Sequence, residues 1–163
     1  MNRNRKIILI TLQPIEPVIE DFVFDSIKLL DNQYEFWIRF HPRMNEYKKN
    51  EIKKLFARKG LTNLEFDKSN SLPLQQLIFN CEVHISYYSG SIIEASLMNK
   101  PSIVLHRIGT TIFEQEIAQN IVFPYLLKEK EKLSQLILYL SDNNKKVKIE
   151  NIDFLSILKD RYS

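Results

Sequence analysis

The sequence predicts an α/β domain in which a mostly parallel sheet of about six strands lies between two layers of helices. Two observations lead to this prediction. Short apolar runs alternate along the chain with amphipathic segments of helical period, which is typical of repeated β-α units. The apolar runs are also nearly continuous, as expected for strands that are covered on both faces. We therefore expect a Rossmann-like three-layer α/β/α sandwich.

The 163-residue chain is expected to form one domain without internal repeats. The predicted strands are 7–12, 34–40, 64–66, 83–87, 102–106 and 121–123. The predicted helices are 18–30, 46–59, 72–79, 92–98, 113–119 and 128–140. Gly60 is expected to cap the second helix, and Pro42 ends the second strand because proline has no N–H for a ladder. Segments 67–71 and 108–111 are expected to be loops. Residues 141–163 are expected to form a loosely packed tail, polar up to 148, with one helical turn at 154–158.

The composition is that of an ordinary soluble globular protein, with 44% hydrophobic and 26% charged residues. Three glycines in the whole chain argue against a propeller, a β-sandwich or a collagen-like fold. A net charge of +3 with scattered basic residues slightly favours an anionic small molecule or a membrane surface, and argues against nucleic acid. A single cysteine, Cys81, excludes an internal disulfide. The polar segment 2–6, which contains three basic residues, precedes an apolar run too short for a signal peptide, so we expect a cytoplasmic protein.

Polar residues follow several of the predicted strands, where a sheet of this class binds its ligands. With the strand order 3-2-1-4-5-6, the crevice lies between the first and fourth strands. Thr11 and Gln13 end the first strand, His41 ends the second, and the turn 89–91 follows the fourth. This turn leads into a helix, whose first N–H groups attract anions, and Gly90 would let a ligand approach the backbone. We therefore expect the phosphates of a ligand at this turn.

Several of these side chains have a structural as well as a functional interpretation. His41 could donate a hydrogen bond to a phosphate or bind a nearby backbone group, and chemistry alone favours neither. Glu94 could accept ribose hydroxyls, but an acid in the first turn of a helix is slightly better explained by the helix dipole. His84 lies inside a strand and is expected to be structural, whereas His106 stays open between the two roles. Cys81 is interpreted as a buried small residue and not a nucleophile.

Motifs for metals and common cofactors are missing from the sequence. There is no zinc-like Cys/His spacing and no Asp-x-Asp pair, and there is neither a complete P-loop nor a Gly-x-Gly-x-x-Gly fingerprint. These features argue against a kinase, an NTPase and a dinucleotide dehydrogenase. We therefore expect neither a metal nor another cofactor.

Two motifs taken together resemble the C-terminal, nucleotide-binding half of a GT-B glycosyltransferase. They are Arg39-Phe40-His41-Pro42, and Ser89-Gly90-Ser91-Ile92-Ile93-Glu94-Ala95 followed by Asn99-Lys100-Pro101 and an apolar strand. The likeness covers 6–140 and is strongest to bacterial capsule, sialyl- and Kdo-transferases and to CDP-glycerol glycerophosphotransferases. It implies a domain of an enzyme of bacterial surface polysaccharide synthesis.

The resemblance also implies roles for particular residues. His41 would be catalytic, and together with Ser89 and Ser91 it would hold the phosphate of a CMP- or CDP-activated sugar, the donor substrate, without a metal. The loop 68–70 would meet the base. The nucleotide-binding residues expected from chemistry and resemblance together are Thr11, Gln13, Ser69, Asn70, Ser89, Gly90, Ser91 and Glu94.

The resemblance leaves alternatives open. Gly90 stands between the two serines, a pattern that also resembles UDP-N-acetylglucosamine 2-epimerases. A non-catalytic interaction module with the same fold is the third interpretation. A GT-B enzyme has two such domains, so the resemblance implies a missing N-terminal domain or a partner subunit. It leaves room for self-association through apolar surface that would meet the other half. Peripheral membrane contact through the basic N-terminus, at the inner face of the cell membrane, is also open.

Overall fold

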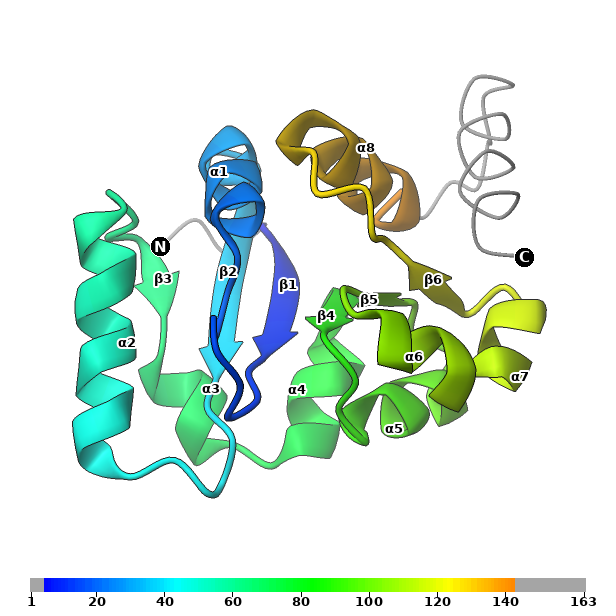
Figure 1. Ribbon diagram of the computed structural model, residues 1–163, viewed down its shortest axis with the longest axis horizontal. Helices are drawn as coiled ribbons and strands as arrows, with labels where there is room; N and C mark the ends of the chain where they lie inside the picture. Colours follow the sequence, from blue (N-terminus) through cyan, green and yellow to red (C-terminus); the bar gives the residue numbers. More distant parts are fainter. Residues whose placement is uncertain (1–4, 143–163) are drawn as a thin grey trace.

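Six parallel strands form one open sheet in the computed structural model, which describes residues 5–142 (Figure 1). The strands are β1 (Lys6–Thr11), β2 (Tyr34–Arg39), β3 (Leu64–Glu65), β4 (Cys81–Ser86), β5 (Ser102–Val104) and β6 (Val122–Pro124). Their order in the sheet is β3-β2-β1-β4-β5-β6, and every neighbouring pair is parallel. The predicted Rossmann-like fold and the predicted strand order are both confirmed.

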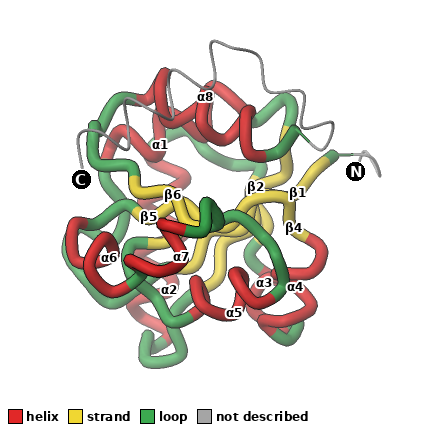
Figure 2. Tube along the Cα trace, turned by 90° about the vertical axis from the view of Figure 1, so that its right-hand side faces the viewer, coloured by secondary structure: helices red, strands yellow, loops and turns green. Residues whose placement is uncertain are grey.

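Helices cover both faces of the sheet. One layer consists of α1 (Asp21–Leu30), α2 (Glu46–Arg58) and α8 (Lys130–Leu140). The opposite layer contains α4 (Leu74–Asn80), α5 (Ser91–Leu97), α6 (Arg107–Ile112) and α7 (Glu114–Ala118). The short helix α3 (Asp67–Ser71) packs against β2. Figure 2 shows α1 and α8 above the strands and α4 and α5 below them.

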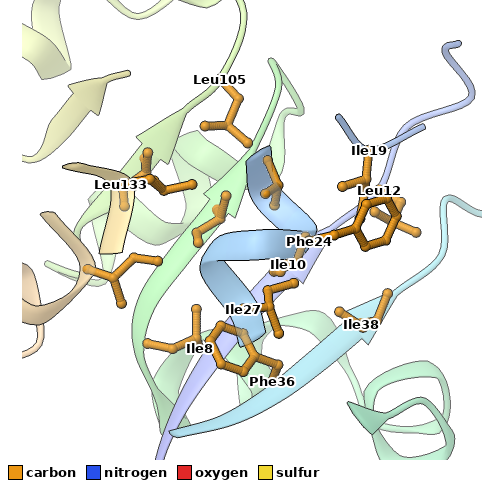
Figure 3. Close-up of a cluster of buried hydrophobic side chains, with 14 of the residues drawn as sticks. Ile8, Ile10, Leu12, Ile19, Phe24, Ile27, Phe36, Ile38, Leu105 and Leu133 are labelled. Carbon is orange, nitrogen blue, oxygen red and sulfur yellow. The ribbon is translucent and has the colours of Figure 1, made fainter. Parts of the chain in front are cut away.

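The larger core lies between the sheet and the α1 layer. In β1, Ile8 and Ile10 belong to this core, whereas Leu9 between them packs in the cluster on the opposite face, as the two-residue period of a strand requires. Phe24 of α1 meets Phe56 of α2 edge to face, with ring centroids 5.0 Å apart. Figure 3 shows this cluster around β1 and α1. Burial of each such side chain contributes about 1.5–3 kcal/mol, so the stability of the fold depends mainly on this layer.

The opposite face of the sheet carries buried polar side chains beneath α5. They are Thr11 of β1, His84 and Ser86 of β4, and Ser102 of β5, all at most 6% exposed. Strand register brings them together, because His84 lies beside Leu9 on one side and beside Ser102 on the other. The predicted structural position of His84 within a strand is therefore correct. Polar groups at this depth need hydrogen-bond partners within the protein.

Two segments predicted as loops are helical. Asp67–Ser71 forms α3, and the side chains of Ser69 and Asn70 anchor it by donating to main-chain carbonyls of β2 and of the residues just before the helix. Residues 108–111 lie within α6, which begins where His106 accepts the first free amide. Both predictions were wrong because neither segment has an apolar period of its own.

The ends of the helices match the predictions more closely. Gly60, with φ of +81°, follows α2, and its amide and that of Leu61 bind carbonyls of the last turn, which confirms the predicted cap. Ser141 was expected to be loose but is buried, with its hydroxyl bonded to Tyr34 and its carbonyl to Lys6 Nζ. The rest of the predicted tail from 143, including the turn at 154–158, lies outside the described residues.

Candidate functional site

The chain segments that leave β1, β2, β4 and β5 begin on the same edge of the sheet, because parallel strands all end on one side. They carry Thr11 and Gln13, His41, the turn 89–91, and His106. The loops after β1 and β2 both lie at the lower end of the sheet in Figure 1. This edge is therefore where the sequence-predicted residues can act together.

His41 has one N–H group without an acceptor among the described residues at this edge. Its ring is half-buried, and Nδ1 accepts a hydrogen bond of 3.1 Å from the amide of Arg43. The main-chain carbonyl of His41 accepts from the amide of Met44 at 3.0 Å, which closes the turn. With Nδ1 as an acceptor, the neutral ring carries its proton on Nε2, and Nε2 has no partner among residues 5–142. The bond to the backbone at Nδ1 thus leaves the Nε2–H group of the same ring available to a ligand.

Ser89 and Gly90 add further donors. The Ser89 hydroxyl oxygen accepts from the amide of Ser91 at 3.2 Å and from its hydroxyl at 2.9 Å, so its own proton is not used in these bonds. The amides of Ser89 and Gly90 meet no acceptor within the described part of the chain. Gly90 has an ordinary φ of −56°, and a Cβ added there would meet nothing within 4 Å. Neither the backbone nor the packing requires glycine at this position, whereas close approach of a ligand would.

Thr11 and Ser91 lie beneath this turn. Their hydroxyl oxygens are 3.1 Å apart, and both are within hydrogen-bonding distance of His84 Nε2, at 2.9 and 3.2 Å. Each residue is 6% exposed. Burial lowers the pKa of His84 to about 3, so its ring is neutral. The expected contact of Thr11 and Ser91 with a nucleotide stays a prediction, but their hydroxyls are bonded within the protein.

Gln13 holds two strand ends together. The residue is 8% exposed, and its Oε1 accepts from the amide of Tyr88 at 2.7 Å. The ring of Tyr88 in turn contacts His106 edge to face, with centroids 5.1 Å apart. His106 Nδ1 accepts from the amide of Ile108 at 3.1 Å, so this ring also directs its remaining nitrogen away from the backbone. Gln13 thus orients the start of the turn at Tyr88, a role that its position in the sequence alone did not indicate.

Ser69 and Asn70 bind main-chain groups of the protein, and their expected contact with a base stays a prediction. Ser69 is fully buried, and its hydroxyl donates to the carbonyl of Ile38 at 2.6 Å. Asn70 is exposed, but its Oδ1 accepts from the amide of Phe40 at 2.8 Å, and its Nδ2 donates to the same Ile38 carbonyl at 2.9 Å. Both side chains therefore fasten α3 to the end of β2. The expectation came from the family resemblance, and the local sequence shows no sign of these long-range bonds.

The remaining candidates are arranged as follows. Glu94 is half-buried one turn into α5, and its carboxylate accepts from Gln75 Nε2 at 3.0 Å, so its contact with a ribose stays a prediction. Cys81 is buried, and burial raises the pKa of its thiol to about 12, as for a packed residue that is no nucleophile. No group of three or more His, Cys, Asp or Glu side chains within 5–142 could hold a metal ion.

Two hollows lie away from the turn 89–91. One of about 440 Å³ lies between residues 16–18 and α2, and the other, of about 360 Å³, lies between the start of α1 and Lys128. Neither of these two hollows is lined by His41 or by the turn. Among residues 5–142, no helix is both long and apolar enough to cross a membrane.

Comparison with known proteins identifies the fold. No protein-family model and no curated protein matches the chain, but solved structures do. A UDP-GlcNAc 2-epimerase from Methanocaldococcus jannaschii, in complex with UDP-GlcNAc and UDP, matches 96% of this chain and 45% of its own with a TM-score of 0.63 and 19% identity. The fold is GT-B-like.

Two transferases support the same assignment. The glycosyltransferase SnogD from Streptomyces nogalater matches 98% of this chain and 39% of its own, with a TM-score of 0.58 and 15% identity. The wall teichoic acid polymerase TagF, soaked with CDPG, matches 98% and 38%, with a TM-score of 0.55 and 15% identity. The chain therefore spans less than half the length of these GT-B-like proteins.

Proposed function

We propose that this chain is the nucleotide-sugar-binding domain of a glycosyltransferase of bacterial surface polysaccharide synthesis. One observation carries the proposal. Hydrogen-bond donors that have no acceptor within the described residues lie on the edge where sheets of this class bind ligands. These donors are the Nε2–H of His41, the hydroxyl of Ser89, and the amides of Ser89 and Gly90. A phosphate group only accepts hydrogen bonds, so it complements a set made up of donors. The GT-B-like fold is consistent with such a ligand.

The proposed donor is a CMP- or CDP-activated sugar. His41 and the turn 89–91 would stabilise the charge that develops on the departing nucleotide phosphate, and Glu94 would accept the ribose hydroxyls. A general base and the acceptor site would come from a second domain, in the same protein or in a partner subunit. We propose a cytoplasmic location and leave contact with the inner face of the cell membrane open. Exposed apolar side chains on α4 and α5, such as Phe79 and Leu97, support contact with that second domain or with another copy of the chain.

The test is a titration of CMP, CDP and UDP followed by backbone amide NMR, with calorimetry for affinity. Shifts should cluster at His41 and 89–94. The matched variant is His41→Asn, because an asparagine side-chain oxygen can still accept from the amide of Arg43 and keep the turn, while the outward Nε2–H is lost. Loss of a hydrogen bond to a charged group predicts an affinity about 10- to 100-fold lower. An unchanged affinity would contradict the role given to His41.

A UDP-sugar 2-epimerase-like domain is the second candidate. The Ser-Gly sequence at 89–90 and the structural likeness to a UDP-GlcNAc 2-epimerase favour it. Tighter binding of UDP than of CMP and CDP would support the epimerase, and the reverse order would support the transferase. Absence of any shift at millimolar nucleotide would leave a non-catalytic interaction module as the better interpretation.

A further inference from the structure

His84 stands at the centre of a buried chain of side-chain hydrogen bonds that ends at the proposed phosphate site. Its Nδ1 lies 2.9 Å from Ser102 Oγ, and its Nε2 lies 2.9 Å from Thr11 Oγ1. The ring is fully buried, and its three hydrogen-bonding neighbours, Thr11, Ser91 and Ser102, are all hydroxyl side chains without charge. None of these bonds is needed to form the sheet, whose strands pair through their main chains.

The first bond determines which nitrogen of His84 carries the proton. Ser102 is fully buried, and among residues 5–142 its hydroxyl has one hydrogen-bond partner, Nδ1 of His84. Ser102 can give its proton to Nδ1, which satisfies both groups. The reverse direction would leave the Ser102 proton buried without an acceptor, at a cost comparable to a lost hydrogen bond. Ser102 is therefore the donor, and the neutral His84 ring carries its proton on Nε2.

The same reasoning continues from Nε2 to the surface. Nε2–H donates to Thr11 Oγ1, and the Thr11 hydroxyl is then left to donate to Ser91 Oγ at 3.1 Å. Ser91 donates to Ser89 Oγ at 2.9 Å, and its amide donates to the same oxygen at 3.2 Å. Ser89 thus accepts twice from within the protein. Its own proton is left for a partner outside the chain of bonds, next to the free amide of Gly90.

We propose that this one-directional chain, from Ser102 through His84, Thr11 and Ser91, positions the Ser89 hydroxyl as a fixed donor to a phosphate oxygen. An isolated serine could rotate and accept as readily as it donates, whereas this one has its acceptor positions engaged. Each bond in such a chain polarises the next, which strengthens the last donor. His84 and Ser102 are therefore positioning residues that never touch the ligand. The inference rests on the proposed function and explains why the proposed site would prefer a phosphoryl group.

The test is a double-mutant cycle between Ser102 and Ser89, with the tightest of CMP, CDP and UDP as the probe. Ser102→Ala should lower the affinity about threefold in the native background, at the low end of measured coupling energies, and should have no effect when Ser89 is already alanine. The matched control is Ser86→Ala. Ser86 is also buried in the sheet on β4, but its hydroxyl donates to the main-chain carbonyl of Thr11, outside the chain of side-chain bonds. This control should keep the native affinity.

Equal losses from Ser102→Ala in both backgrounds, or no loss in either, would overturn the proposal in favour of simple packing. A second readout is the protonated nitrogen of His84 by ¹⁵N NMR, assigned by the signal that His84→Gln removes. We expect the proton on Nε2, and a proton on Nδ1 with nucleotide binding intact would overturn this inference alone. If the native protein binds none of the three nucleotides, the proposed function and the phosphate partner of Ser89 both fail.

Discussion

Acidification from pH 7.5 to 5.0 should destabilise the native protein by about 2 kcal/mol through His84 alone. Burial lowers the pKa of His84 to about 3 in the folded state, whereas the unfolded chain should bind this proton near the ordinary pKa of 6.5. Between these values the unfolded state holds more protons, so stability falls as the pH falls, by about 1.4 kcal/mol per pH unit. The loss of stability accumulates only between about pH 6.5 and pH 5.0, which gives the total of about 2 kcal/mol. Above that pH both states are neutral at His84 and its contribution is constant.

Urea unfolding at pH 7.5, 6.0 and 5.0 measures this effect, with the fluorescence of Trp37 as the probe. Trp37 is the single tryptophan and is buried in β2. His84→Gln is the reference because glutamine does not titrate, and all other groups titrate in both proteins. The difference in unfolding free energy between the two should shrink by about 2 kcal/mol from pH 7.5 to 5.0. Parallel pH profiles would refute the reasoning, as would a His84 resonance that titrates above pH 5 in the native protein. The resonance decides the question even if the variant does not fold.

Three further substitutions separate residues that stabilise the fold from residues that would contact a ligand. Gly109→Ala would place a Cβ 2.1 Å from Val104 Cγ1, so urea unfolding should show a loss of about 1–3 kcal/mol. Gly90→Ala meets nothing and should stay within about 0.5 kcal/mol of native stability but bind nucleotide more weakly; unchanged affinity would speak against close approach of a ligand. Asn70→Ala should lower the free energy of unfolding by about 1–3 kcal/mol, because it leaves the Phe40 amide without its acceptor. Weaker nucleotide binding by this variant, with an unchanged free energy of unfolding, would instead support a contact of Asn70 with the base.

The fold was predictable because its signals are local. Continuous apolar runs of strand length and amphipathic helical segments follow each other along the chain, and parallel strands with helical crossovers leave few topologies to choose from. The same argument placed His41 and the turn 89–91 on one edge, since each directly follows a strand. The cap at Gly60 was predictable for the same reason, because it depends only on the residue itself and the end of its helix.

The functions of the individual polar residues depended on neighbours that are distant in sequence. Ser69 is separated by 31 positions from Ile38, whose main-chain carbonyl accepts the hydrogen bond from its hydroxyl, and this contact fastens α3 to β2. His84 is 73 positions from Thr11, and strand register alone brings the two together. The sequence by itself determined the layers, the strand order and the edge at which a ligand could bind. The tertiary structure decided which polar groups are hydrogen-bonded within the protein and which remain free for a ligand. A hydrogen bond requires two groups to meet, and only the packed sheet brings these groups together.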